Sequence, residues 1–221
     1  MQSGGIGIGP VQREILQDVT LPLAPGTVVY PGDPPVTMHR YADLTDQGYQ
    51  ASAIGLSLHA GTHVDAPCHL EPGAAGVDAW SLRTFLGPAQ VIDCRSLQGV
   101  DADFLAAHLD PGVERVLLMT GGGPALRAGQ TGGGYLTECG ARLLAERGAV
   151  LVGIDSLSVD APHAAALPAH RALLPRGVVV VEGLDLTGVA AGVWELFCLP
   201  LRVTGGDGAP ARVLLRHVSP A

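Results

Sequence analysis

Residues 178–182 read Val178-Val179-Val180-Val181-Glu182, and this stretch decides the class of fold. Four consecutive valines are typical of a strand that is buried on both faces, as in a sheet that helices cover. Residues 116–119 and 151–154 are further apolar runs between turn residues, and they indicate two more buried strands. We therefore expect a sheet whose central strands lie inside the protein.

Two helices are predicted between these strands. Asp101 or Asp103 is a suitable N-cap for the first, and Thr137 is a suitable N-cap for the second, which runs through Arg147. Strands and helices thus alternate through residues 91–154, which is the pattern of an α/β protein.

Weaker signals lie elsewhere in the chain. Residues 18–20 and 27–29 are expected to be short strands, and residues 38–50 a mixed, polar loop. Residues 121–124 and 131–134 are rich in glycine, but they lack a basic partner and the spacing of a phosphate cradle. We expect both glycine-rich stretches to be mobile loops.

Glu182 ends the valine run and needs a partner. An unpaired carboxylate inside a protein is very costly in free energy. A metal ion would be such a partner, and so would an arginine.

Residues 59–69 read His-Ala-Gly-Thr-His-Val-Asp-Ala-Pro-Cys-His and hold three of the eight histidines. A single histidine is usually an ordinary surface or core residue, but three with an aspartate among them are harder to explain that way. Imidazole and carboxylate at this density suit zinc or manganese. Cys68 is either a further ligand or a small buried residue.

The local pattern predicts how this motif is presented. Apolar residues alternate along residues 53–59, so we expect a half-buried strand with His59 on the face opposite to them. Gly61 allows the backbone to turn. In an extended segment His63 and Asp65 share a face, because side chains repeat every second residue.

The motif resembles the H-x-G-T-H-x-D-A-P-x-H signature of the metal-dependent cyclase family, which includes bacterial kynurenine formamidases and isatin hydrolases. Other segments resemble that family in the same order along the chain. They are residues 30–33, 153–160, 170–171, 181–184, 199–202 and 206–210. The resemblance implies a single swivelling β/β/α domain at residues 13–221, after a flexible leader at residues 1–12.

The resemblance also implies two adjacent metal sites, with two Zn²⁺ per chain or Mn²⁺ in their place. His59, His63 and Asp65 would hold the first ion. Asp65 would bridge to the second, which His170 completes, and Glu182 would reach both.

His69 would then be the proton carrier and not a ligand. Tyr30 would contact an aryl substrate, although kynurenine formamidases usually carry tryptophan there; tyrosine can still stack on an aryl ring. The implied reaction is cleavage of N-formyl-L-kynurenine to formate and L-kynurenine by a homodimer. Hydrolysis of isatin or another small cyclic amide or lactone is the alternative. A non-catalytic metal-binding protein is disfavoured, because such a protein needs neither a histidine beyond the ligand set, His69, nor an aromatic residue near the site, Tyr30.

Composition excludes other classes. The net charge of −8 opposes a nucleic-acid partner, which needs a basic surface. All 13 basic residues are arginine, so there is no Schiff-base or phosphate-binding lysine. No apolar run reaches the roughly 18 residues that span a membrane. The four cysteines are widely spaced, and the first residues lack the features of a signal peptide, so we expect reduced thiols in the cytoplasm.

Overall fold

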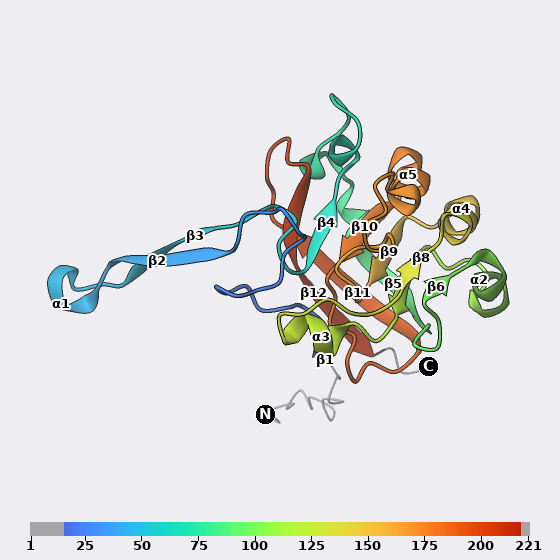
Figure 1. The fold of residues 1–221 in the computed structure, drawn as a ribbon, viewed down its shortest axis with the longest axis horizontal. Coiled ribbons are helices and arrows are strands. Elements are labelled where there is room, and N and C mark those ends of the chain that lie inside the picture. Colours follow the sequence, from blue (N-terminus) through green and yellow to red (C-terminus); the bar gives the residue numbers. More distant parts are fainter. Residues whose placement is uncertain (1–15, 218–221) are drawn as a thin grey trace, which may run out of the picture.

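The computed structural model describes residues 16–217 as a mixed sheet with helices on its outer side (Figure 1). The strands are β1 (Leu16–Asp18), β2 (Thr37–Ala42), β3 (Ala51–Gly55), β4 (His63–Asp65), β5 (Leu86–Asp93), β6 (Gly99–Val100), β7 (Arg115–Met119), β8 (Tyr135–Leu136), β9 (Leu151–Ile154), β10 (Val179–Glu182), β11 (Gly192–Pro200) and β12 (Gly208–His217). The helices are α1 (Leu44–Gln47), α2 (Ala102–His108), α3 (Gly123–Arg127), α4 (Glu138–Glu146) and α5 (Pro168–Leu173). Short 3₁₀ turns are η1 (Pro67–His69), η2 (Val77–Ala79), η3 (Leu82–Phe85) and η4 (Leu174–Arg176).

The main sheet closes on itself. Its strand order is β1-β12-β11-β5-β7-β9-β10-β4, and β4 also pairs with β12, so seven strands form a ring. Strands β5, β7, β9 and β10 are parallel, whereas β4, β11 and β12 join their neighbours antiparallel. β4 and β1 pair with the same edge of β12, β4 with residues 208–210 and β1 with residues 214–216. The expected α/β class is therefore confirmed, with the sheet curled into a barrel.

The valine run is buried on both faces, as predicted. Val179 and Val181 of β10 belong to the core inside the ring, and Val180 belongs to the core beneath the helices. Strands β7 and β9 divide their side chains in the same way. Helices α2, α4 and α5 cover the outer face (Figure 1). This double burial explains the near-continuous apolar sequence of the parallel strands.

Both predicted helices are confirmed, with the expected caps. Asp101 is the N-cap of α2 and accepts a hydrogen bond from the backbone N–H of Phe104. Thr137 is the N-cap of α4 and accepts from the backbone N–H of Gly140. Each cap satisfies a backbone donor that the first turn of a helix cannot pair.

The prediction of a half-buried strand over residues 53–59 is wrong. β3 ends at Gly55, and a turn follows in which the backbone N–H of Ala60 bonds to Ser57 O at 3.1 Å. Gly61 then adopts a positive φ of 66°. Ile54 is 48% exposed because β3 does not lie over the core, so its alternation buries no face.

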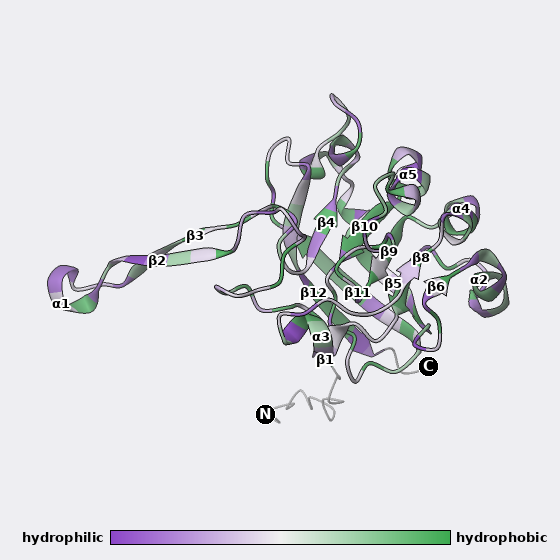
Figure 2. Cartoon of the chain, viewed as in Figure 1, coloured by the Kyte–Doolittle hydropathy of each residue, from purple (hydrophilic) through white to green (hydrophobic). Residues whose placement is uncertain are grey.

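β2 and β3 instead form a hairpin with α1 at its tip, called here the arm (residues 37–55). The arm projects far from the ring (Figure 1), and apolar segments lie along it (Figure 2). The loop expected at residues 38–50 is therefore wrong. The strand expected at residues 27–29 is absent as well, since these residues have no strand pairing.

Two sequence features bear on the boundaries. The leader expected at residues 1–12 lies outside the described residues. No helix within residues 16–217 combines the length and the apolar character that a membrane span requires.

Candidate metal centre

The predicted ligands come from four segments that the closed ring brings together. His63 and Asp65 lie on β4, which is held between β10 and β12. Glu182 is the last residue of β10 and pairs in register with His63. His170 lies on α5, and His59 lies in the turn that precedes β4. The expectation that His63 and Asp65 share a face of an extended segment is confirmed by their contact of 3.5 Å.

Two groups of potential ligand atoms share Asp65. His59, His63 and Asp65 form one group, and Asp65, His170 and Glu182 form the other, with the atoms of each within 4.8 Å of one another. Oδ1 of Asp65 lies 2.8 Å from His59 Nδ1, and its Oδ2 lies 3.2 Å from His170 Nε2. The two carboxylate oxygens thus face different histidines.

The outer nitrogen of each imidazole meets an oxygen atom. His63 Nδ1 donates to Gly61 O at 3.0 Å, and His170 Nδ1 donates to an Asp160 carboxylate oxygen at 2.6 Å. His59 Nε2 lies 3.1 Å from an Asp207 carboxylate oxygen. Such contacts select the tautomer whose other nitrogen presents a lone pair, which is how metal-binding histidines are oriented.

His63 carries the clearest sign of a cation site. Its Nε2 is buried and has no hydrogen-bond partner, although it faces Asp65 Oδ1 and Glu182 Oε2, both at 3.5 Å. A lone pair that faces two carboxylate oxygens is unfavourable unless a proton or a metal ion lies among them. The donor set of three imidazoles and two carboxylates therefore fits a divalent metal.

The charges of the cluster are strongly coupled. Burial would raise the pKa of Asp65, but hydrogen bonds from His170 and His59 hold it well below its ordinary value. Burial and the charge of Asp65 oppose ionisation of Glu182, yet His170 and His63 lower its pKa to about 2. Burial disfavours the charged form of His59, and Asp65 and Asp207 outweigh it to raise the pKa to about 9. Without a metal, protonated histidines thus balance the buried carboxylates.

His69 lies beside this cluster. Its ring centroid is 4.3 Å from that of His59 and 5.9 Å from that of His170. It is partly buried, and its nearest ionic contact is a distant one of 4.0 Å to Asp207. Burial is the largest influence on its imidazole and lowers the pKa, so a neutral ring is favoured.

Two residues of the cluster were not assigned a role from the sequence alone. Asp160 lies in the segment 153–160 that resembles the family, and it both supports a predicted ligand and caps the first turn of α5. It bonds to His170 Nδ1 and also accepts from the backbone N–H groups of Ala169 and His170. For Asp207, the sequence indicated only that it lies in the segment 206–210, which resembles the family. Cys68 is in neither group that contains Asp65 and instead packs against the core, with its thiol near Gly206 O at 3.5 Å.

A cavity of about 370 Å³ adjoins the cluster. Ser158 and Asp160 lie in its wall and bond to Glu182 and His170 respectively. Tyr30 lines the same cavity and is 38% exposed. The structure therefore brings the predicted aryl contact to a cavity beside the predicted metal ligands.

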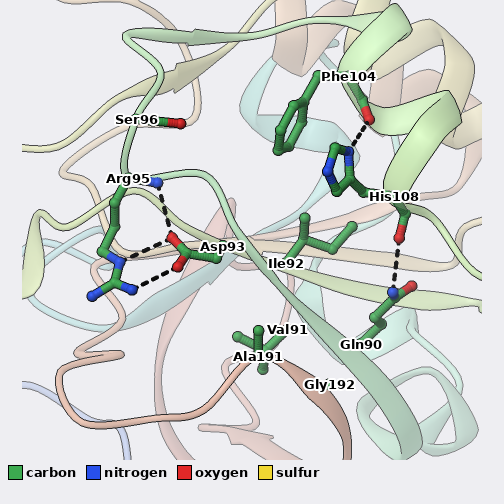
Figure 3. A pocket seen from close by; sticks show the side chains of 10 residues that line it. All are labelled: Gln90, Val91, Ile92, Asp93, Arg95, Ser96, Phe104, His108, Ala191 and Gly192. Atoms are coloured by element: carbon green, nitrogen blue, oxygen red, sulfur yellow. Dashed lines mark hydrogen bonds and ion pairs between the residues drawn. The ribbon is translucent and has the colours of Figure 1, made fainter.

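A larger hollow of about 910 Å³ lies elsewhere, between β5 and α2 (Figure 3). Several of its polar groups are already paired: Arg95 with Asp93, and the Gln90 amide with His108 O. It contains no group of His, Cys, Asp and Glu side chains that could hold a metal, as far as residues 16–217 show. Although this hollow is larger than the cavity beside the cluster, we do not assign the active site to it.

A ring of mixed strands with a buried imidazole–carboxylate cluster is the arrangement of a metal-dependent α/β protein. Residues 17–161 match the family model described as Cyclase. The kynurenine formamidase of Salinibacter ruber (strain DSM 13855 / M31) is 37% identical over 207 residues, which cover 91% of this chain and 97% of that protein. The chain belongs to the Cyclase family.

Solved structures agree with this assignment. One described as a potential metal-dependent hydrolase with cyclase activity has a TM-score of 0.81 at 31% identity, over 94% of this chain and 100% of that chain. Isatin hydrolase A from Labrenzia aggregata has a TM-score of 0.81 at 24% identity, over 93% of this chain and 94% of that chain. The second likeness is one of fold alone. The expected cyclase-like fold is thus confirmed.

We predict that metal affinity rises with pH through about 9, because His59, whose pKa is raised to about 9, and His170, whose pKa is raised well above its ordinary value, must lose a proton before they bind a metal. Below that pH, affinity should fall by about tenfold per pH unit for each histidine that is deprotonated on binding. Calorimetric titration with Zn²⁺ in buffers of different ionisation enthalpy measures the protons released.

Asp207→Asn is the matched variant. It removes one of the two carboxylates that raise the His59 pKa, so the pH dependence should move to lower pH. An affinity that does not change between about pH 6 and pH 9 contradicts the prediction.

Proposed function

We propose that the protein is a metal-dependent amidohydrolase that cleaves the formamide of N-formyl-L-kynurenine to formate and L-kynurenine. The observation that carries the proposal is the pair of ligand groups that share Asp65, beside a cavity that Tyr30 lines. The 37% identity to a kynurenine formamidase over 91% of the chain supports the substrate. Hydrolysis of a cyclic amide such as isatin remains the alternative to be assayed in parallel.

We propose two Zn²⁺ per chain, with Mn²⁺ as the other candidate. His59, His63 and Asp65 would hold one ion, Asp65 and His170 the other, and Glu182 would reach both. When bound, such ions polarise a carbonyl group and lower the pKa of water to about 7. Asp160, Asp207 and the carbonyl of Gly61 hold the imidazoles in place for them.

We propose that His69 transfers the proton. Its neutral imidazole can accept the proton that the attacking water loses and deliver it to the departing aryl nitrogen. Its position beside His59 and His170 supports this role. His69 also forms a third group of potential ligands with His59 and Asp207, so the metal content of a His69 variant must separate the two roles. Tyr30 would stack on the aryl ring of the substrate.

Removal of metal should abolish activity. After chelation and dialysis, we expect no hydrolysis of N-formyl-L-kynurenine, and titration with Zn²⁺ or Mn²⁺ should restore it with a stoichiometry of two per chain. Absorbance assays with N-formyl-L-kynurenine and with isatin compare the two substrates. Full activity in a preparation shown to be metal-free would refute the mechanism, whereas preference for isatin would change only the substrate.

Variants of two histidines should separate ligand from proton carrier. His63→Ala should lose metal and activity together, whereas His69→Asn should keep the metal. General acid–base catalysis contributes about 10²–10⁴-fold, so kcat of His69→Asn should fall within that range. Metal content measured by mass spectrometry is the control, and loss of metal from His69→Asn would make His69 a ligand.

We propose that the protein is a homodimer and that the arm contacts the second copy. Five large apolar side chains of the arm are exposed in the described structure: Met38, Tyr41, Leu44, Tyr49 and Ile54. A two-stranded hairpin on its own is at best marginally stable in water. Burial of these side chains against a second copy would stabilise both the arm and the dimer.

Two exposed leucines provide a matched test of the arm. Leu44 on the arm is 67% exposed and Leu82 on the body is 72% exposed. Leu44→Asp should weaken the dimer, because a carboxylate would be buried in the interface, and Leu82→Asp should not. Sedimentation velocity at several concentrations measures the assembly. Equal masses for the parent and Leu44→Asp would exclude the arm from the interface.

We also propose that residues 13–221 form one domain and that it works in the cytoplasm. β1 near the start of the described chain pairs with β12 near its end, from Leu16 with Arg216 to Asp18 with Leu214, which supports one domain. The four cysteines are all free thiols, which fits a reducing compartment.

A further inference from the structure

The wall of the cavity beside the metal centre has two chemically different parts. In one part, Ser158 and Asp160 contact the cluster through Glu182 and His170. The remaining wall includes Tyr30, the glycines at 132–134 and His163. No part of the proposed chemistry uses these glycines or His163.

The glycine segment offers backbone donors. Hydrogen bonds among the described residues leave the backbone N–H groups of Gly132, Gly133 and Gly134 without an acceptor. Successive backbone N–H groups of this kind form concavities that bind anions. The sequence lacked the basic partner of a phosphate cradle, but a single carboxylate requires fewer donors.

Tight packing holds this segment in place, contrary to the mobile loop predicted for residues 131–134. The Ser156 hydroxyl donates to Gly134 O at 2.6 Å. The hydroxyl oxygens of Thr120 and Ser156 are 3.0 Å apart. Gly133 has a φ of 89°, and a Cβ atom there would clash with the Ser156 hydroxyl. The donors are therefore fixed before a ligand arrives, which lowers the entropy lost on binding.

His163 adds a side-chain donor to the same wall. It is the one lysine, arginine or histidine among the residues that line the cavity. Within residues 16–217, no hydrogen bond or ion pair engages its ring. Its φ of 64° is unusual for a residue other than glycine, and such conformations cluster at functional sites. The imidazole can donate an N–H in either charge state.

We propose that His163 and the backbone N–H groups of Gly132–Gly134, which lie in the wall of this cavity, bind the carboxylate of an aryl amide substrate. The substrate would place its amide at the metal centre, its ring at Tyr30 and its carboxylate at His163. This assignment rests on the proposed function. A protein with a net charge of −8 repels anions at long range, so an anionic substrate needs such local donors.

Two variants and two substrates test the assignment. Asn and Asp both tolerate a positive φ and have nearly the same shape, so His163→Asn and His163→Asp differ mainly in charge. N-formyl-L-kynurenine and N-formylkynuramine differ only in the α-carboxylate. The kcat/KM for the first substrate should be roughly tenfold lower in His163→Asp than in His163→Asn. For the second substrate the two variants should be equal.

Each outcome has a distinct meaning. Metal content and melting temperature should match the parent in both variants, because His163 lies outside the cluster. If both variants hydrolyse the two substrates at the same ratio as the parent, the carboxylate does not bind at His163, and the proposed function stands. If the parent hydrolyses neither substrate when loaded with metal, the proposed function itself fails. Binding of L-kynurenine, measured by calorimetry, should weaken by the same factor in His163→Asp.

Discussion

The buried carboxylate of Asp65 is the constraint on which the rest of the structure depends. It is 1% exposed, and such a group is stable only where hydrogen-bond donors and positive charge surround it. Without a metal, protonated His59 and His170 donate to different oxygens of Asp65, and Glu182 adds a second buried negative charge. The cluster therefore holds more carboxylate than a folded core tolerates without protons or a metal ion.

Closure of the ring makes this arrangement rigid. β4 is only three residues long, yet it pairs with β10 on one edge and with β12 on the other. Backbone bonds on both edges fix the direction of its side chains, so His63 and Asp65 must face the same side. The chemistry thus depends on sheet topology as much as on the motif.

The supporting contacts connect the cluster to the cavity. Asp160 orients His170 and also lies in the cavity wall, and Ser158 similarly contacts Glu182 from that wall. A ligand in the cavity would therefore touch residues that contact the potential metal ligands of the cluster.

The sequence alone determined the buried strands, the two capped helices, the family and the five potential ligands of the cluster, because apolar periodicity, N-caps and a dense histidine motif are local signals. It did not determine the arm, since the same apolar alternation at residues 53–59 is compatible with a half-buried strand and with a hairpin strand that buries no face. It also gave no role to Asp160 or Asp207. Asp207 meets His59 from 148 positions away in the chain, and only the closed ring brings such partners together.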